Sequence, residues 1–206
     1  MAEIGVRRTR EGFARLITFA DAVVAIALTL LVLPLTDLAN EGAENAGFTS
    51  FVAENYPVML SFAISFAVIW VLWRNHHRIM EHFVAYDDVL AKLHLVWLAT
   101  IIVLPFATAL LDNSRMQWSN VFYIAVLGVS IISLRGIARW GIAHPALLDD
   151  DADTRAWAAQ PSDYGTLIAV AAALIVAIVV PQADAWPLLL LLLSSPIDAL
   201  INRFRH

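Results

Sequence analysis

The sequence contains no cysteine and few charged residues, and these two absences exclude several classes of protein. Without cysteine the chain has no disulfide and no thiolate chemistry. Charged residues make up only 15% of the 206 positions, whereas hydrophobic residues make up 60% and the mean hydropathy is +0.72. These values lie outside the range of soluble globular domains. The net charge of -5 also argues against a nucleic-acid partner, so we expect a domain in contact with the lipid bilayer.

Apolar runs separated by charged segments predict an all-α integral membrane protein with six transmembrane helices in a single domain, residues 1–206. A helix needs about 20 apolar residues to cross a bilayer, and the last two runs are somewhat shorter than that. The six predicted helices are residues 13–35, 55–80, 86–111, 120–142, 164–180 and 185–202. Pro57 suits the first turn of the second helix, and Pro105 should kink or loosen the third.

Two longer polar segments are predicted to be exposed connections. Residues 36–54 carry four acidic residues and two glycines, which is typical of a loop. Residues 143–163 carry a run of aspartates between 149 and 153 that lacks the spaced ligands and central glycine of a calcium-binding loop. We interpret this second segment as a solvated acidic loop with little structure.

The basic residues indicate how the chain is oriented in the membrane. With both termini in the cytoplasm, the cytoplasmic segments hold every lysine and arginine except Arg115, as the positive-inside rule expects. The basic amino terminus would also suit a signal peptide, but Asp21 interrupts the start of the apolar run and no A-x-A-like cleavage site follows. We therefore expect the first helix to be retained.

The first predicted helix combines ionisable residues at one end with a regular apolar stripe. Arg15 and Asp21 lie at its mouth, and an ionisable residue there is a functional-site hypothesis by default. Beyond them Ile26, Leu30 and Leu33 share one face at i, i+4 and i+7. Ala22 and Thr29 flank this stripe. Spacing alone leaves two interpretations open. The stripe either packs against other helices, which is the commoner case, or lines a pore.

The start of this helix resembles a motif of the transmembrane protein 175 family, R-x-x-x-F-S-D. The matching residues are Arg15, Phe19 and Asp21, and Ala20 stands where the family has serine. Trp73 and His77, one turn apart at the end of the second predicted helix, resemble a second feature of the family. Its members are endosomal and lysosomal potassium channels in animals, with shorter relatives in bacteria.

The resemblance implies a potassium-selective, leak-type cation channel in a bacterial plasma membrane. It further implies a homotetramer in which the first helix lines a central pore, with potassium ions as the permeating partner. The pore would then be constricted by Ile26, Leu30 and Leu33 and flanked by Ala22 and Thr29. The sequence has no T-V-G-Y-G filter, so side chains would have to select and gate. No enzyme activity and no cofactor are expected.

The ionisable residues leave two further hypotheses. We expect a structural or gating network of Arg15, Phe19, Asp21, Trp73 and His77, joined by Lys92 near the cytoplasmic ends of the helices. An alternative function is a proton-linked secondary transporter that uses Asp21, His77 and His94. A third hypothesis is an intramembrane metalloenzyme that uses His76, His77 and His82. It is the weakest of the three, because the spacing of these residues matches neither H-E-x-x-H nor H-x-x-E-H. We interpret residues 74–82 as a solvated helix end, and no metal is assigned.

Overall fold

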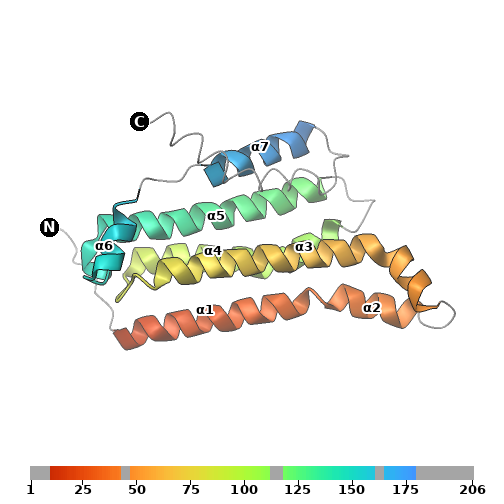
Figure 1. Cartoon of the computed structure of the whole chain (residues 1–206), viewed down its shortest axis with the longest axis horizontal. Helices are drawn as coiled ribbons and strands as arrows, with labels where there is room; N and C mark the ends of the chain where they lie inside the picture. Colours follow the sequence, from red (N-terminus) through yellow and green to blue (C-terminus); the bar gives the residue numbers. More distant parts are fainter. Residues whose placement is uncertain (1–9, 43–46, 112–117, 161–164, 180–206) are drawn as a thin grey trace.

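The computed structural model describes residues 10–42, 47–111, 118–160 and 165–179, and the regular structure in these ranges is helical (Figure 1). The helices, in chain order, are α1 (Arg10–Leu30), α2 (Leu33–Gly42), α3 (Phe48–Met80), α4 (Asp88–Leu111), α5 (Ser119–Ala143), the short 3₁₀ helix η1 (Pro145–Leu147), α6 (Ala152–Ala158) and α7 (Gly165–Val179). The predicted sixth span, 185–202, lies outside the described residues, and so do residues 1–9 of the amino-terminal segment.

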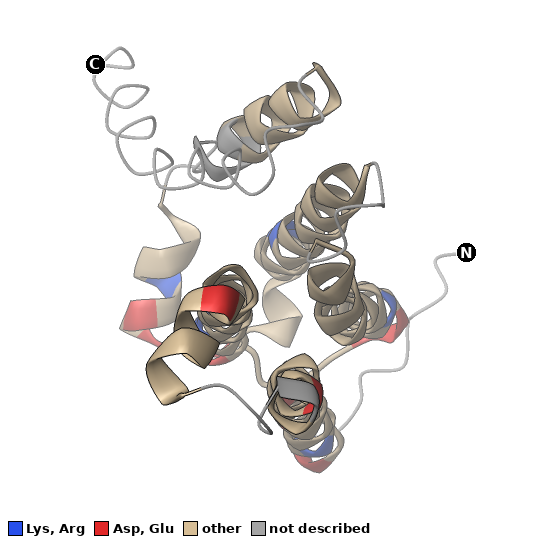
Figure 2. Cartoon of the chain, turned by 90° about the vertical axis from the view of Figure 1, so that its right-hand side faces the viewer, with Lys and Arg blue, Asp and Glu red and all other residues tan. Residues whose placement is uncertain are grey.

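Helix α4 occupies the centre of the bundle. It packs against α1, α3 and α5, and α7 packs on the far side of α5. Figure 2 looks along the bundle and shows these helices end on, with α6 to one side. The central position follows from the composition of α4, which is apolar nearly all round. Its Trp97, Ile101 and Leu104 side chains are completely buried.

Four of the described helical segments are long and apolar enough to cross a membrane. They are Arg10–Asn40, Phe48–Met80, Asp88–Leu111 and Ser119–Ala143. The predicted all-helical membrane class is therefore confirmed, while the count of six spans stays a prediction. The predicted fifth span corresponds to α7, whose apolar part, Val170–Val179, is shorter than a full crossing.

The segment after α1 differs from the predicted loop. The first helix was predicted to be continuous to Leu35, but α1 ends at Leu30 and α2 begins at Leu33. Pro34 explains the break, because its nitrogen has no hydrogen to donate to the carbonyl of Leu30. The exposed loop predicted at 36–54 is wrong over most of its described length, since α2 continues to Gly42 and α3 begins at Phe48. Pro57 accordingly lies inside α3 rather than in its first turn.

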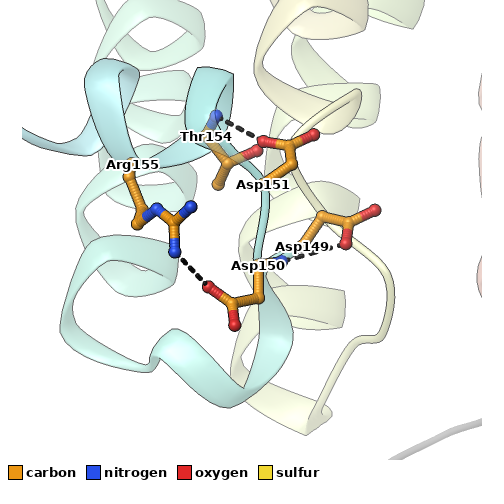
Figure 3. Close-up of polar contacts among 5 residues, drawn as sticks. All are labelled: Asp149, Asp150, Asp151, Thr154 and Arg155. Carbon is orange, nitrogen blue, oxygen red and sulfur yellow. Dashed lines mark hydrogen bonds and ion pairs between the residues drawn. The ribbon is translucent and has the colours of Figure 1, made fainter.

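The segment predicted to be an unstructured acidic loop at 143–163 is also folded in its described part. Helix α6 begins at an N-cap, in which Asp151 Oδ1 accepts a hydrogen bond of 2.6 Å from the backbone N–H of Thr154 (Figure 3). Arg155 forms an ion pair of 3.0 Å with Asp150. The prediction failed because the aspartates cap and pair locally, while Leu147 beside them is buried.

The turn between α3 and α4 holds this folded segment against the bundle. The backbone N–H of Val84 donates to the carbonyl of Leu147 (2.9 Å), and the N–H of Asp149 donates to the carbonyl of His82 (2.9 Å). Phe83 lies so close to Gly141 of α5 that a Cβ at that position would clash with its ring. The absence of a side chain at Gly141 therefore allows the turn and α5 to meet.

Candidate functional site

The predicted pore stripe lies on a face of α1 that the other described residues leave exposed. Ile26 is 59% exposed, Leu30 42% and Leu33 51%, although Leu33 stands after the helix break and begins α2. Ala22 and Thr29 are exposed as well, so the predicted flanking residues accompany the stripe. We call Phe19, Ala22, Ile26, Thr29 and Leu30 the outer face of α1.

The opposite side of α1 packs into the bundle through smaller side chains. Ala20, Val24 and Ala27 are buried at successive turns, and Leu31 continues the row just past the helix end. These residues belong to the same core cluster as Trp97, Ile101 and Leu104 of α4. We call Ala20, Val24, Ala27 and Leu31 the inner face of α1. Small residues allow two helices to approach closely, which matches the contact between α1 and α4.

Asp21 lies between these two faces and joins α1 to α3. Its Oδ1 accepts a hydrogen bond of 2.8 Å from Trp73 Nε1. Trp73 stacks on His77 with ring centroids 5.4 Å apart, and His77 Nε2 lies 3.5 Å from Glu81 Oε1. Three of the predicted network residues, Asp21, Trp73 and His77, are therefore in contact. Phe19 points outward with 59% of its surface exposed, and Arg15 and Lys92 lie on the surface of the chain.

The structure also reveals a buried aromatic cluster that the sequence did not indicate. His76 is completely buried, and its ring lies flat on Trp97 with centroids 4.0 Å apart. His94 of α4, also completely buried, meets His76 edge to face at 4.8 Å. The prediction that residues 74–82 form a solvated helix end is therefore wrong for His76. The polar run from Arg74 to Arg78 led to the prediction of a solvated end, although the buried residues Ile69, Leu72, His76 and Met80 of α3 recur at helical spacing.

The three histidines near the end of α3 contact different tryptophans. His76 stacks on Trp97 and His77 on Trp73, while His82 stacks on Trp157 of α6 at 4.5 Å. The Nδ1 atom of His82 also lies 3.0 Å from Thr154 Oγ1. The three histidines therefore contact three different tryptophans. Within the described ranges, no three histidine or acidic side chains lie close enough together to hold a metal ion.

Two further contacts connect helices across the bundle. Asp87 accepts hydrogen bonds from the N–H of Leu90 (2.8 Å) and from Trp140 Nε1 of α5 (2.9 Å). It thus stabilises the start of α4 and ties it to α5. In the other half of the bundle, Thr108 Oγ1 donates a hydrogen bond of 2.8 Å to Ser65 Oγ. The same Ser65 oxygen lies 3.3 Å from the hydroxyl oxygen of Tyr123. This second group joins α3, α4 and α5, and every member has a partner.

Comparison with known proteins relates the first half of the chain to one family of channels. The family model described as "Endosomal/lysosomal potassium channel TMEM175" matches residues 15–105, a segment that contains Asp21, Trp73, His76 and His94. The resemblance found in the sequence is therefore confirmed, and the chain is a helical membrane protein.

Individual relatives are named as channels for two different cations. The chain is 38% identical to a potassium channel of Chamaesiphon minutus over 97 residues, which are 47% of this chain and 48% of that protein. It is 32% identical to a potassium channel of Streptomyces collinus over 97 residues, 47% of this chain and 46% of that protein. It is 28% identical to the endosomal/lysosomal proton channel TMEM175 of Mus musculus over 149 residues, 69% of this chain and 29% of that protein. The chain thus spans about half the length of the two bacterial relatives.

Proposed function

Because residues 15–105 carry the segment of the transmembrane protein 175 family, we propose that this chain forms a potassium-selective, leak-type cation channel. Four copies surround a central pore lined by α1, and Ile26, Leu30 and Leu33 constrict it. The observation that carries the proposal is the exposure of large apolar side chains along the outer face of α1, which no other described part of the chain covers.

A single outer face cannot enclose a path for ions, so the proposal requires several copies around an axis. Rings of Ile26 would then narrow the path with branched apolar side chains that provide no ligand for a cation. Such constrictions gate by losing water, and they fit a sequence without a carbonyl-lined filter. Thr29 can line the same path at little cost, because its hydroxyl is already bonded to the carbonyl of Ile26 at 2.7 Å.

A second candidate function is the movement of protons, either through the pore or coupled to a solute. Two observations favour it: the mouse relative is named a proton channel, and the described helices bury His94 completely in the bundle. In the coupled form, a secondary transporter would use Asp21, His77 and His94. We place the protein in the bacterial plasma membrane with both termini in the cytoplasm, following its basic residues.

Ion flux from liposomes tests these functions against one another. The purified chain is reconstituted with potassium inside, and flux is followed after the external cation is changed to sodium, or after a pH gradient is applied without potassium. A potassium channel conducts down the potassium gradient with no coupling ion. Flux that requires a pH gradient would support the transporter instead, and flux of protons alone would support the proton channel. A conducting species with the mass of one copy would contradict the pore formed by several α1 helices.

A further inference from the structure

Five buried ring nitrogens lie together where α3 meets α4. They belong to His76, His94 and Trp97, which we call the histidine–tryptophan cluster, and all three side chains are completely buried. The atoms are His76 Nδ1 and Nε2, His94 Nδ1 and Nε2, and Trp97 Nε1, and none has a hydrogen-bond partner among the described residues. Buried polar atoms are nearly always paired with protein or ordered water, so five together call for a ligand.

The rings cannot satisfy one another. The planes of His76 and Trp97 are 6° from parallel, and N–H bonds lie in the ring plane, so a stacked pair exchanges no hydrogen bond. His94 stands nearly perpendicular to both, at 84° to His76 and 87° to Trp97, with centroids 4.8 and 5.9 Å away. The three centroid distances place His94 beside the edge of the stacked His76 ring, and no hydrogen bond joins the nitrogens of the two histidines. The partner has to come from outside the three side chains.

The chemistry of the five atoms limits what that partner can be. A neutral histidine provides one donor and one acceptor, and tryptophan provides only a donor, so the cluster offers three donors and two acceptors. A metal ion could use the acceptors but could not accept the Trp97 N–H. An anion could accept from the three donors but could donate nothing to the two acceptors. Water both donates and accepts, and buried water typically makes about three hydrogen bonds.

We propose that His76, His94 and Trp97 form an internal water site between α3 and α4, beside Asp21 of α1. The position gives the site a structural consequence. Asp21 Oδ1 is occupied by Trp73, so bound water on the side of His94 would extend the polar contact from α3 and α4 to the first helix. This would be a second polar connection across three helices, separate from the Ser65, Thr108 and Tyr123 group.

Hydroxyl-radical labelling of the reconstituted full chain tests the site directly. Short X-ray pulses in ¹⁸O water oxidise side chains that lie next to ordered water, even when those side chains are buried. Trp97 should be labelled several-fold faster than Tyr123 once their intrinsic reactivities are taken into account. Tyr123 is a matched control, because it is only 1% exposed and its hydroxyl is already bonded to Ser65. Labelling of Trp97 no faster than that of Tyr123 would overturn the proposal.

Two variants connect the labelling to the cluster. His94→Leu removes one donor and one acceptor at similar size and should lower the labelling of Trp97 several-fold. His77→Leu, which changes a half-exposed histidine outside the cluster, should leave it unchanged. If His94→Leu does not fold, the wild-type comparison and a high-resolution density map still decide the question, since the map must show density at about 3 Å from the cluster nitrogens. A stoichiometric metal in the purified protein would replace water as the ligand and overturn the proposal.

These readouts do not involve ion current. The water site can therefore fail while the proposed channel stands, and the channel can fail while the water site stands.

Discussion

The inner and outer faces of α1 differ in how far the rest of the described chain buries them. The inner face buries Ala20, Val24 and Ala27 against the bundle, and the outer face leaves Phe19 and Ile26 more than half exposed. In a soluble protein such an outer face would be placed inside. In a membrane helix it identifies the side that must meet lipid, another copy of the chain or the axis of a pore. The difference shows that α1 contacts its own chain through the inner face, while Phe19, Ile26 and Leu30 of the outer face remain exposed.

The largest effect is expected from placing a polar group on the inner face. Val24 is 3% exposed, so Val24→Asn buries an amide without a partner and loses apolar packing. Burying such a group costs about 1–3 kcal/mol, to which the lost packing adds. The variant should give a low yield of folded protein and a lower midpoint of thermal unfolding in detergent. A midpoint equal to the wild type would show that α1 does not pack through this face.

The same substitution on the outer face should instead change conduction. Ile26→Asn adds the same amide where no described side chain is displaced, so folding and assembly should persist. In a pore, the amide would hold water at the constriction, so the current should rise and discrimination between potassium and sodium should weaken. Reversal potentials in mixed potassium and sodium solutions measure both effects. A folded variant with unchanged conductance and selectivity would remove Ile26 from the constriction and break the functional half of the comparison.

A smaller effect is expected at the contact that fixes α1 between its two faces. Trp73→Phe removes the donor to Asp21, and an unmet polar group of this kind costs about 1–3 kcal/mol when it is buried. The cost should be at the lower end, since Asp21 is only half-buried. Trp70→Phe is the matched control, because Trp70 lies one turn earlier on α3 and is 47% exposed.

Thermal unfolding of both variants, each with and without Asp21→Asn, isolates the contact. The loss caused by Trp73→Phe should shrink when Asp21 is already changed, because the two residues act through one bond. Fully additive losses would mean that the bond contributes nothing to the position of α1.

The sequence predicted the parts of this arrangement that depend on one helix or one motif. The apolar runs predicted α4 and α5 within two residues at each end, and three of the motif residues, Asp21, Trp73 and His77, lie in contact. It could not predict which side of α1 faces the bundle, because large apolar residues suit lipid and protein equally well. The small inner-face residues were the available signal, since Ala20, Val24 and Ala27 recur at helical spacing.

The remaining errors come from tertiary contacts that override local signals. Pro57 indicated a helix start, yet α3 begins nine residues before it and continues through it. Aspartates 149–153 indicated a loop, but neighbouring Leu147 is buried and Asp151 caps α6. His76 is adjacent to His77 within a polar run, but it continues the buried row of α3 and stacks on Trp97 of α4.

The smallest effect on stability is expected at the N-cap of α6, which belongs to neither of the two compared faces of α1. The backbone N–H of Thr154 bonds to Asp151 and, together with the Thr154 hydroxyl, lowers the pKa of that carboxyl below its ordinary 3.8. The charged cap therefore stabilises α6 at pH values above 3.8, and this contribution is lost as the pH falls through the lowered pKa.

Asp151→Ala should reduce thermal stability slightly at neutral pH, whereas Asp151→Asn should keep the cap and abolish its pH dependence. In the proposed channel, neither change should alter the current. If Asp151→Ala changed ion selectivity as strongly as Ile26→Asn, a loss of stability far from α1 would be enough to change selectivity. The effect of Ile26→Asn would then be no evidence that the outer face of α1 lines the pore.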